Sequence, residues 1–151
     1  MEERFEMFTI MIAKASRYIK RLKTEEMSEF ELKTPHVSCI YYLYKKEKLT
    51  SKELCDICEE DKASISRSIE YLEKNGYIRC LDQAKKRYKS PLVLTEKGLE
   101  VGKKIEEKID NILAKSSEGL SEKEREIFYK SFEIICDNLQ KIYDNYGIDE
   151  K

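Results

Sequence analysis

The stretch DKASISRSIEYLEKNGYI, residues 61–78, has the pattern of a short helix with a marked start and a marked end. Asp61 is a favourable N-cap, and Gly76 can take the left-handed conformation that closes a helix. Between them, three apolar residues recur at helical spacing and define one buried face: Ile65, Ile69 and Leu72. The sequence therefore predicts a helix over Lys62–Asn75 that packs on a core along this row and leaves its opposite face exposed.

The exposed side of this helix is small, hydroxylic and positive near its start. At 100° per residue, Ser64 and Arg67 point away from the buried row, and Ser66 and Ser68 lie on the flanks. With Lys62, these are the five candidate binding residues of the helix. Hydroxyls and helix N-terminal N–H groups bind phosphate, and an arginine can hold a guanine edge through two hydrogen bonds. An ordinary solvated helix has a similar composition, so the interpretation as a DNA-binding face depends on the next segment of the chain.

A basic hairpin is predicted immediately downstream. Residues 77–81 and 90–94 have the pattern of two short strands, and the loop between them carries four cationic residues: Lys85, Lys86, Arg87 and Lys89. From Asp61 to Lys97 there are nine Lys and Arg against five Asp and Glu, although the net charge of the whole chain is -1. A basic segment within an acidic chain is suited to a phosphate-bearing partner.

Two further helices are predicted upstream. Thr34 and Pro35 are suited to the N-cap and first turn of a helix that ends near Lys46. Thr50 and Glu53 have the spacing of a capping box, which opens a short helix with Leu54, Ile57 and Cys58 on its buried side. The order of helix, helix and basic hairpin is that of a winged helix-turn-helix, so we expect a mainly α fold of the α+β class.

The ends of the chain are predicted to be helical. One amphipathic segment covers about residues 3–23, Thr95 caps a helix over about 96–115, and Ser121 with Glu124 forms a second capping box. The helix after this box carries an apolar row: Phe128, Phe132, Ile135, Leu139 and Ile142. We expect this row to pack against the first helix of a second subunit.

Residues 61–78 resemble the recognition helix of the MarR family of transcriptional regulators, and Leu94–Gly98 resembles the segment that follows the wing in that family. The resemblance implies one domain over residues 1–151. Its winged-helix DNA-binding lobe would occupy about residues 34–98, and its dimerisation helices about 3–33 and 99–147. It also implies a homodimer that binds a pseudo-palindromic operator in double-stranded DNA, usually as a repressor.

The same resemblance implies where DNA is contacted. Ser64, Ser66, Arg67 and Ser68 would lie at the major groove. Many members carry an Asp-x-Arg in the wing whose arginine enters the minor groove. Here the corresponding positions hold Lys86 and Tyr88 with Arg87 between them, and we expect Arg87 to take that role.

The family also binds small aromatic or lipophilic effectors between its dimer helices and its DNA-binding lobe. His36 and Tyr41 are the residues that we would place at such a site. Simpler interpretations exist for both: His36 in the first turn of its helix as a surface or capping residue, and Tyr41 as aromatic core.

Two other functions remain open. Cys55-x-x-Cys58 is consistent with ordinary packing or with a thiol-based redox sensor. A zinc site is not predicted, because no second such pair is present and the chain has one histidine. A winged-helix module for protein interaction is the other alternative, favoured by the acidic total charge and by Glu70 and Glu73 on the candidate helix.

Catalysis has little support, because no Gly-rich phosphate loop, paired histidines or nucleophile with a base is recognisable. We expect a binding protein rather than an enzyme, with no cofactor and no metal. The sequence shows no apolar run of about 20 residues and no export signal. The five cysteines are therefore expected to be reduced, and the protein cytoplasmic.

Overall fold

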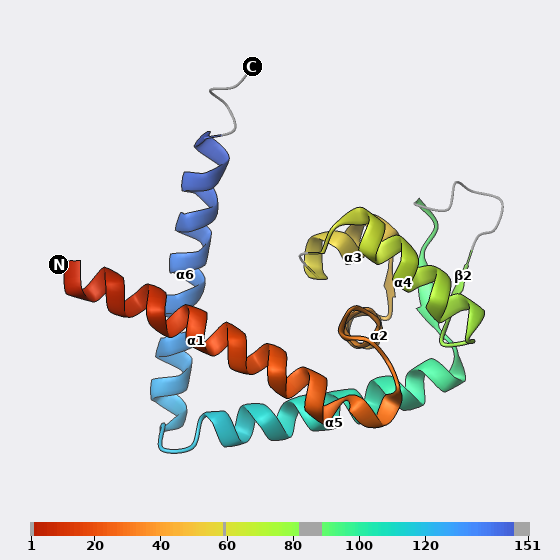
Figure 1. Cartoon of the computed structure of the whole chain (residues 1–151), viewed down its shortest axis with the longest axis horizontal. Helices are drawn as coiled ribbons and strands as arrows, with labels where there is room; N and C mark the ends of the chain where they lie inside the picture. The colour runs from red at the N-terminus through yellow and green to blue at the C-terminus, as the bar shows by residue number, and fades with distance from the viewer. Residues whose placement is uncertain (1, 59, 82–88, 147–151) are drawn as a thin grey trace. The chain divides into compact units, whose positions relative to one another are not determined.

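The computed structural model describes residues 2–58, 60–81 and 89–146 (Figure 1). The elements in chain order are α1 (Glu2–Glu26), η1 (Ser28–Phe30), α2 (Thr34–Lys46), β1 (Lys48–Leu49), α3 (Ser51–Cys58), α4 (Lys62–Lys74), β2 (Ile78–Cys80), β3 (Leu92–Leu94), α5 (Glu96–Ser116) and α6 (Glu122–Tyr146). Residues 1–109 form one compact unit and residues 110–151 a second. The predicted mainly helical winged-helix class is confirmed.

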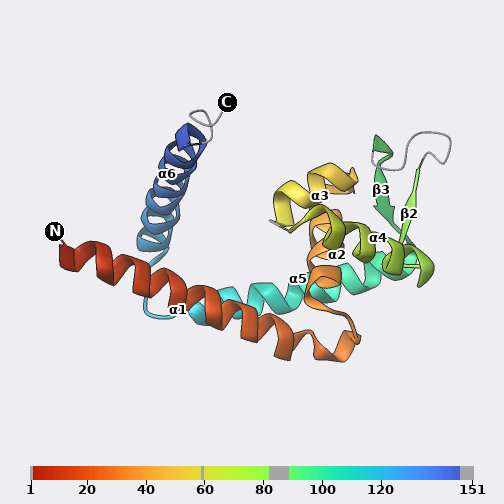
Figure 2. The same ribbon diagram turned by 45° about the horizontal axis from the view of Figure 1, so that its top comes forward.

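A small antiparallel sheet completes the first unit. Its strand order is β1-β3-β2, with Leu49 opposite Leu92 and Arg79 opposite Val93. Strands β2 and β3 are the predicted hairpin, and Figure 2 shows them side by side near the end of α4. The two-residue strand β1 was not predicted, because so short a segment has no alternation to detect.

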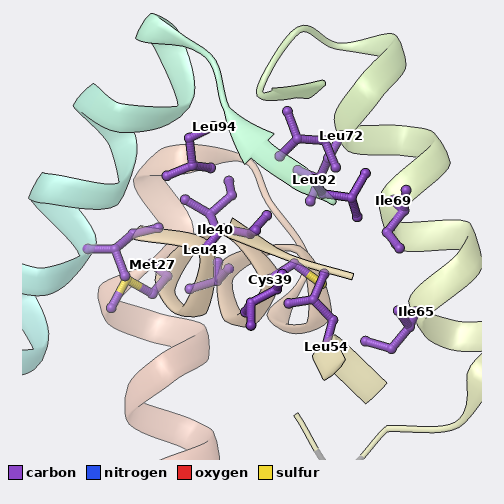
Figure 3. Close-up of a cluster of buried hydrophobic side chains, with 14 residues drawn as sticks. Met27, Cys39, Ile40, Leu43, Leu54, Ile65, Ile69, Leu72, Leu92 and Leu94 are labelled. Carbon is purple, nitrogen blue, oxygen red and sulfur yellow. The ribbon is translucent and has the colours of Figure 1, made fainter. Parts of the chain in front are cut away.

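The hydrophobic core is built around α2. Cys39, Ile40 and Leu43 are completely buried, and α3, α4 and β3 contribute side chains to the same cluster (Figure 3). From these elements come Leu54, Ile65, Ile69, Leu72 and Leu92. The predicted buried row of α4 is therefore confirmed, and burying aliphatic side chains of this size contributes roughly 1.5–3 kcal/mol each.

The helix ends follow the predicted capping chemistry with one exception. The carboxylate of Glu53 accepts the N–H and hydroxyl of Thr50 at 2.7 and 2.8 Å, which confirms the capping box of α3. The second box, between Ser121 and Glu124 at the start of α6, is also confirmed, with a backbone bond of 2.8 Å.

The exception is α2, where the N-cap is Lys33 and not Thr34. The backbone N–H of Lys33 donates to His36 Nδ1 at 3.3 Å, so the imidazole does the capping and Thr34 becomes the first helical residue.

The two terminal helices carry apolar side chains that the chain itself leaves uncovered. On α1 the exposed residues include Met7, Ile10, Met11, Tyr18, Ile19 and Leu22, and on α6 they include Ile127, Phe128, Ile135, Leu139, Ile142 and Tyr146. Most are more than 40% exposed. Within the described ranges, no helix combines the length and the apolar character that crossing a bilayer requires.

Candidate DNA-binding surface

Helix α4 is held with its polar side towards solvent. Lys62, Ser66 and Arg67 are exposed, and Ser64 is partly exposed. The Asp61 carboxylate accepts the backbone N–H of Ser64 at 2.8 Å, which fixes where the helix starts. The first two turns therefore present two cations and two hydroxyls on the side away from the core.

Ser68 does not belong to this surface. It is only 3% exposed, and its hydroxyl donates to the carbonyl of Ser64 at 2.9 Å. The expectation that Ser68 lies on the flank of an accessible face is wrong. Helix α4 sinks so deeply into the core at Ile65 and Ile69 that Ser68, beside this row, is covered as well.

The end of α4 is tied to the start of α5. Gly76 has φ +75°, and the N–H groups of Gly76 and Tyr77 return to the carbonyls of Glu73 and Leu72, as in a Schellman motif. The Thr95 hydroxyl donates to the Gly76 carbonyl at 2.6 Å and accepts the N–H of Gly98 at 3.1 Å. One side chain thus caps α5 and holds the end of α4.

Two neighbours of Thr95 complete this junction. Lys97 Nζ donates to the Asn75 carbonyl at 2.9 Å and lies 4.0 Å from the centre of the Tyr77 ring. Gly98 passes so close that a Cβ there would be 2.0 Å from the Tyr77 carbonyl oxygen. None of these residues was predicted to be functional, although the Leu94–Gly98 motif was the available signal.

The wing is described only at its base. Strands β2 and β3 lie beside the C-terminal part of α4 in both views (Figures 1 and 2). Lys89 is exposed, whereas Lys85, Lys86 and Arg87 lie outside the described residues. A common surface formed by α4 and these wing cations stays a prediction.

His36 joins α2 to α4. Its ring stacks on Tyr71 of α4, with centroids 4.3 Å apart and an interplanar angle of 5°. The predicted capping role of His36 is confirmed, but the expected surface position is wrong, since the residue is 8% exposed. Burial, with a smaller contribution from Lys33, lowers the pKa of His36, so the ring is neutral and able to accept the Lys33 N–H at neutral pH.

A pocket of about 430 Å³ is lined by residues of α1, of the start of α2 and of the segments next to them. Its lining combines three lysines with apolar side chains and one acid: Lys20, Lys23, Lys33, Leu32, Pro35 and Glu60 are among the lining residues. His36 and Tyr41 are not among them. Tyr41 is partly buried against the core and edge-on to Tyr42, with ring centroids 5.3 Å apart.

Cys55 and Cys58 are both partly buried against the hydrophobic core, as the interpretation of ordinary packing predicts. Hydrogen bonding with Cys39 of α2 lowers the pKa of the Cys58 thiol, and partial burial opposes this shift. All five cysteines are free thiols. Among the described residues, no three His, Cys, Asp or Glu side chains come together in a group that could hold a metal ion.

The sequence model of the MarR family matches residues 30–87, which confirms the resemblance predicted from the recognition-helix segment. The match covers α2, β1, α3, α4 and β2. No curated protein matches the chain.

Solved structures of the MarR family share the fold over nearly the whole chain. A regulator from Listeria monocytogenes, complexed with 26mer DNA, is 22% identical, with a TM-score of 0.79 over 87% of this chain and 88% of that one. MarR from Staphylococcus aureus, in complex with salicylate and kanamycin, is 15% identical, with a TM-score of 0.80 over 93% and 95%. A regulator from Neisseria meningitidis is 15% identical, with a TM-score of 0.79 over 94% and 97%.

Proposed function

From its MarR-family winged helix, we propose that this protein is a homodimeric regulator of transcription that binds pseudo-palindromic DNA through α4. The observation that carries the proposal is the exposed face of α4, where Lys62, Ser66 and Arg67 surround a capped helix start. Backbone N–H groups and hydroxyls at this end suit phosphates, and the Arg67 guanidinium suits a guanine edge. The role is one of binding rather than of catalysis.

The relative from Listeria monocytogenes supports the DNA partner, because that protein was solved in complex with DNA. Lys85, Lys86 and Arg87 extend the contact in this proposal. Their charge would neutralise backbone phosphates beside the groove that α4 enters, with Arg87 directed to the minor groove. Ser68 has no part in it, since its hydroxyl is committed to the Ser64 carbonyl.

The terminal helices support a homodimer. Apolar rows on α1 and α6 are exposed in the single chain, and an exposed apolar surface of this extent usually marks an interface. A two-fold axis would place two copies of α4 about 34 Å apart, on successive turns of one face of the duplex. Residues 34–98 are then the DNA-binding lobe, and residues 3–33 and 99–147 the dimerisation region of one functional domain.

Repression released by a small effector is the mode of action that we propose. The pocket beside α2 has three lysines and an apolar wall, which suits an aromatic or lipophilic molecule that carries a carboxylate. The Staphylococcus aureus relative was solved with salicylate, a molecule of this kind. His36 accepts the N–H of Lys33, which lines the pocket, and stacks on Tyr71 of α4, while Tyr41 packs against the core.

Selection of bound sequences from random duplex DNA tests the proposal. We expect the protein to enrich an inverted repeat whose half-sites are about 10 base pairs apart from centre to centre. Arg67→Ala should fail to enrich the same half-site. Absence of any enriched sequence, together with binding that shows no dependence on salt, would overturn the proposal and favour a winged-helix module for protein interaction.

A further inference from the structure

Glu70 lies in the middle of the outward face of α4. The buried residues Ile65 and Ile69 fix which side of the helix faces inward, and Figure 3 shows both pointing from α4 into the core. At 100° per residue, the opposite side carries one row of exposed residues: Ala63, Arg67, Glu70 and Lys74. These residues lie within about 60° of one another around the helix axis, so a duplex that meets Arg67 also meets Glu70.

The carboxylate of Glu70 has no partner within the described part of the chain. Arg67 and Lys74 lie three residues before it and four residues after it on the same helix, yet neither forms an ion pair with it. The carboxylates of Glu53 and Glu124, by contrast, each accept a backbone N–H and a hydroxyl in a capping box. Both oxygens of Glu70 are therefore available to accept hydrogen bonds from a ligand of this face.

A carboxylate is unsuited to a surface that binds only the DNA backbone. Phosphate oxygens are negative and have no hydrogen to donate, so a contact with them would be repulsive. In the major groove, the hydrogen-bond donors that base pairs present are the amino groups of cytosine N4 and adenine N6. Adenine places the acceptor N7 beside its amino group, whereas cytosine presents the amino group alone. Cytosine N4 is therefore the better match for a carboxylate.

We propose that Glu70 is a specificity-determining residue that accepts a hydrogen bond from the N4 amino group of a cytosine in the major groove. The inference rests on the proposed DNA binding through α4, and it names a second base that this helix selects besides the guanine at Arg67. Three residues along a helix advance about 4.5 Å, and successive base pairs are about 3.4 Å apart. The cytosine is therefore expected one or two base pairs from the guanine in each half-site.

The same carboxylate disfavours DNA of other sequences. Where guanine or thymine replaces the cytosine, Glu70 faces the acceptors guanine O6 and N7 or thymine O4. Specificity is a difference between two affinities, and a repulsive contact with the wrong partner increases it. Glu70 therefore weakens binding to arbitrary duplexes more than it weakens binding to the correct half-site.

Two substitutions of Glu70 separate attraction from repulsion. Glu70→Gln keeps the size of the side chain, and glutamine pairs with adenine through N6 and N7. Selection from random duplex DNA should then change the preferred base from cytosine to adenine at one position of each half-site. Glu70→Ala removes both the charge and the acceptor, so it should select no base at this position. It should also bind random duplex DNA several-fold more tightly than wild type at the same salt concentration.

Fluorescence anisotropy measures the discrimination directly. The probes are two duplexes of the site that wild type selects, one of them with thymine in place of the cytosine assigned to Glu70. We expect wild type to prefer the cytosine duplex roughly 5- to 150-fold, and Glu70→Ala to bind both duplexes almost equally. The matched control is Glu100→Gln, which removes the charge of an exposed carboxylate on α5 and should keep the wild-type ratio.

The outcomes distinguish this inference from the proposed function. Wild-type protein that enriches no sequence contradicts both. Wild-type protein that enriches a half-site, with Glu70→Gln and Glu70→Ala selecting the same base at every position, overturns the role of Glu70 and leaves DNA binding through α4 standing. Loss of selection at every position by Glu70→Gln, with an unchanged circular dichroism melt, would also overturn it, because a residue that contacts one base changes one position.

Discussion

Arg67 is the exposed guanidinium in the first two turns of α4, between a buried face and solvent. If its two hydrogen bonds read a guanine, Arg67→Ala removes about 1–3 kcal/mol of binding free energy, or roughly 5- to 150-fold in affinity, and relaxes the base preference at one position. Fluorescence anisotropy with the selected site and with a site altered at that base measures both effects.

Lys74→Ala is the matched control for Arg67→Ala, because Lys74 is exposed at the opposite end of the same helix. It should lower affinity for all sequences to the same small extent. Equal losses on the two DNA sites for Arg67→Ala would assign Arg67 to phosphate contact instead of base recognition.

Gly98 shows how strictly one position can be constrained by backbone contact. A Cβ at this position would lie 2.0 Å from the Tyr77 carbonyl oxygen, so Gly98→Ala forces α5 away from the end of α4. We expect a loss of about 3 kcal/mol in the free energy of unfolding, measured by urea denaturation.

Gly76→Ala gives the comparison for Gly98→Ala. A Cβ at Gly76 meets nothing within 4 Å, and the penalty comes from its φ of +75° alone. The expected loss is therefore smaller, about 1 kcal/mol. A larger loss for Gly76→Ala than for Gly98→Ala would show that the close approach of α5 to Tyr77 is not maintained in solution.

Among the helices and strands, the sequence predicts those whose ends carry capping residues. The helices over α2, α3, α4 and α5 were predictable because each start and end has its own signal, such as Asp61 and Gly76 around α4. Ser68 was misplaced because helical periodicity gives a direction but not how deeply a helix sinks into its core. The stacking of His36 on Tyr71 joins residues far apart in sequence, and no local pattern reveals it.

The capping box that starts α6 gives a dependence on pH. The hydroxyl and backbone N–H of Ser121 donate to Glu124 and hold the pKa of that carboxyl below its ordinary value of 4.5. Because the folded-state pKa is the lower one, the stabilisation is complete above the ordinary pKa and is lost as pH falls through the folded-state value. Glu124→Gln should therefore lower Tm at about pH 7 and have little effect near pH 3.

Circular dichroism melts of wild type and Glu124→Gln across this pH range measure the difference. Glu126→Gln is the control, because Glu126 lies in the same part of α6 but outside the capping box. A difference in Tm for Glu124→Gln that stays constant from neutral to acid pH would mean that the carboxylate does not act as a cap.

The wing gives a second prediction at this scale. Replacing both Lys86 and Arg87 with alanine should weaken binding to every DNA sequence and reduce the slope of log affinity against log salt, by about 0.9 for each phosphate that the wing no longer neutralises. Titrations at two or more salt concentrations measure the slope. An unchanged slope would mean that the wing does not contact DNA phosphates. A change in base preference would mean that the wing recognises bases instead.

For the molecule as a whole, the uncovered apolar rows of α1 and α6 predict a second copy of the chain. We expect light scattering to give twice the chain mass of 17.9 kDa at micromolar concentration. Leu139 is 52% exposed in the single chain, so Leu139→Glu should leave each subunit folded but bury a charge in the interface, shifting the mass to that of a monomer.

Lys141→Glu is the control for Leu139→Glu. It changes charge on the same helix at an exposed position outside the apolar row, and it should remain dimeric. Loss of the dimer in Leu139→Glu should also reduce DNA affinity sharply, since two linked half-sites bind far more tightly than one. Wild-type protein that is monomeric at micromolar concentration would contradict the proposed homodimer and its pair of α4 helices on DNA.

The junction at Thr95 has a mechanical consequence. The Thr95 hydroxyl donates to the carbonyl of Gly76, just beyond α4, and accepts an N–H from the first turn of α5, while Lys97 donates to the carbonyl of Asn75. Because these bonds join the two segments, we expect a displacement of the first turn of α5 to shift the residues that follow α4. Thr95→Val removes the hydroxyl that makes both bonds, so it should leave the start of α5 less firmly attached to the residues that follow α4.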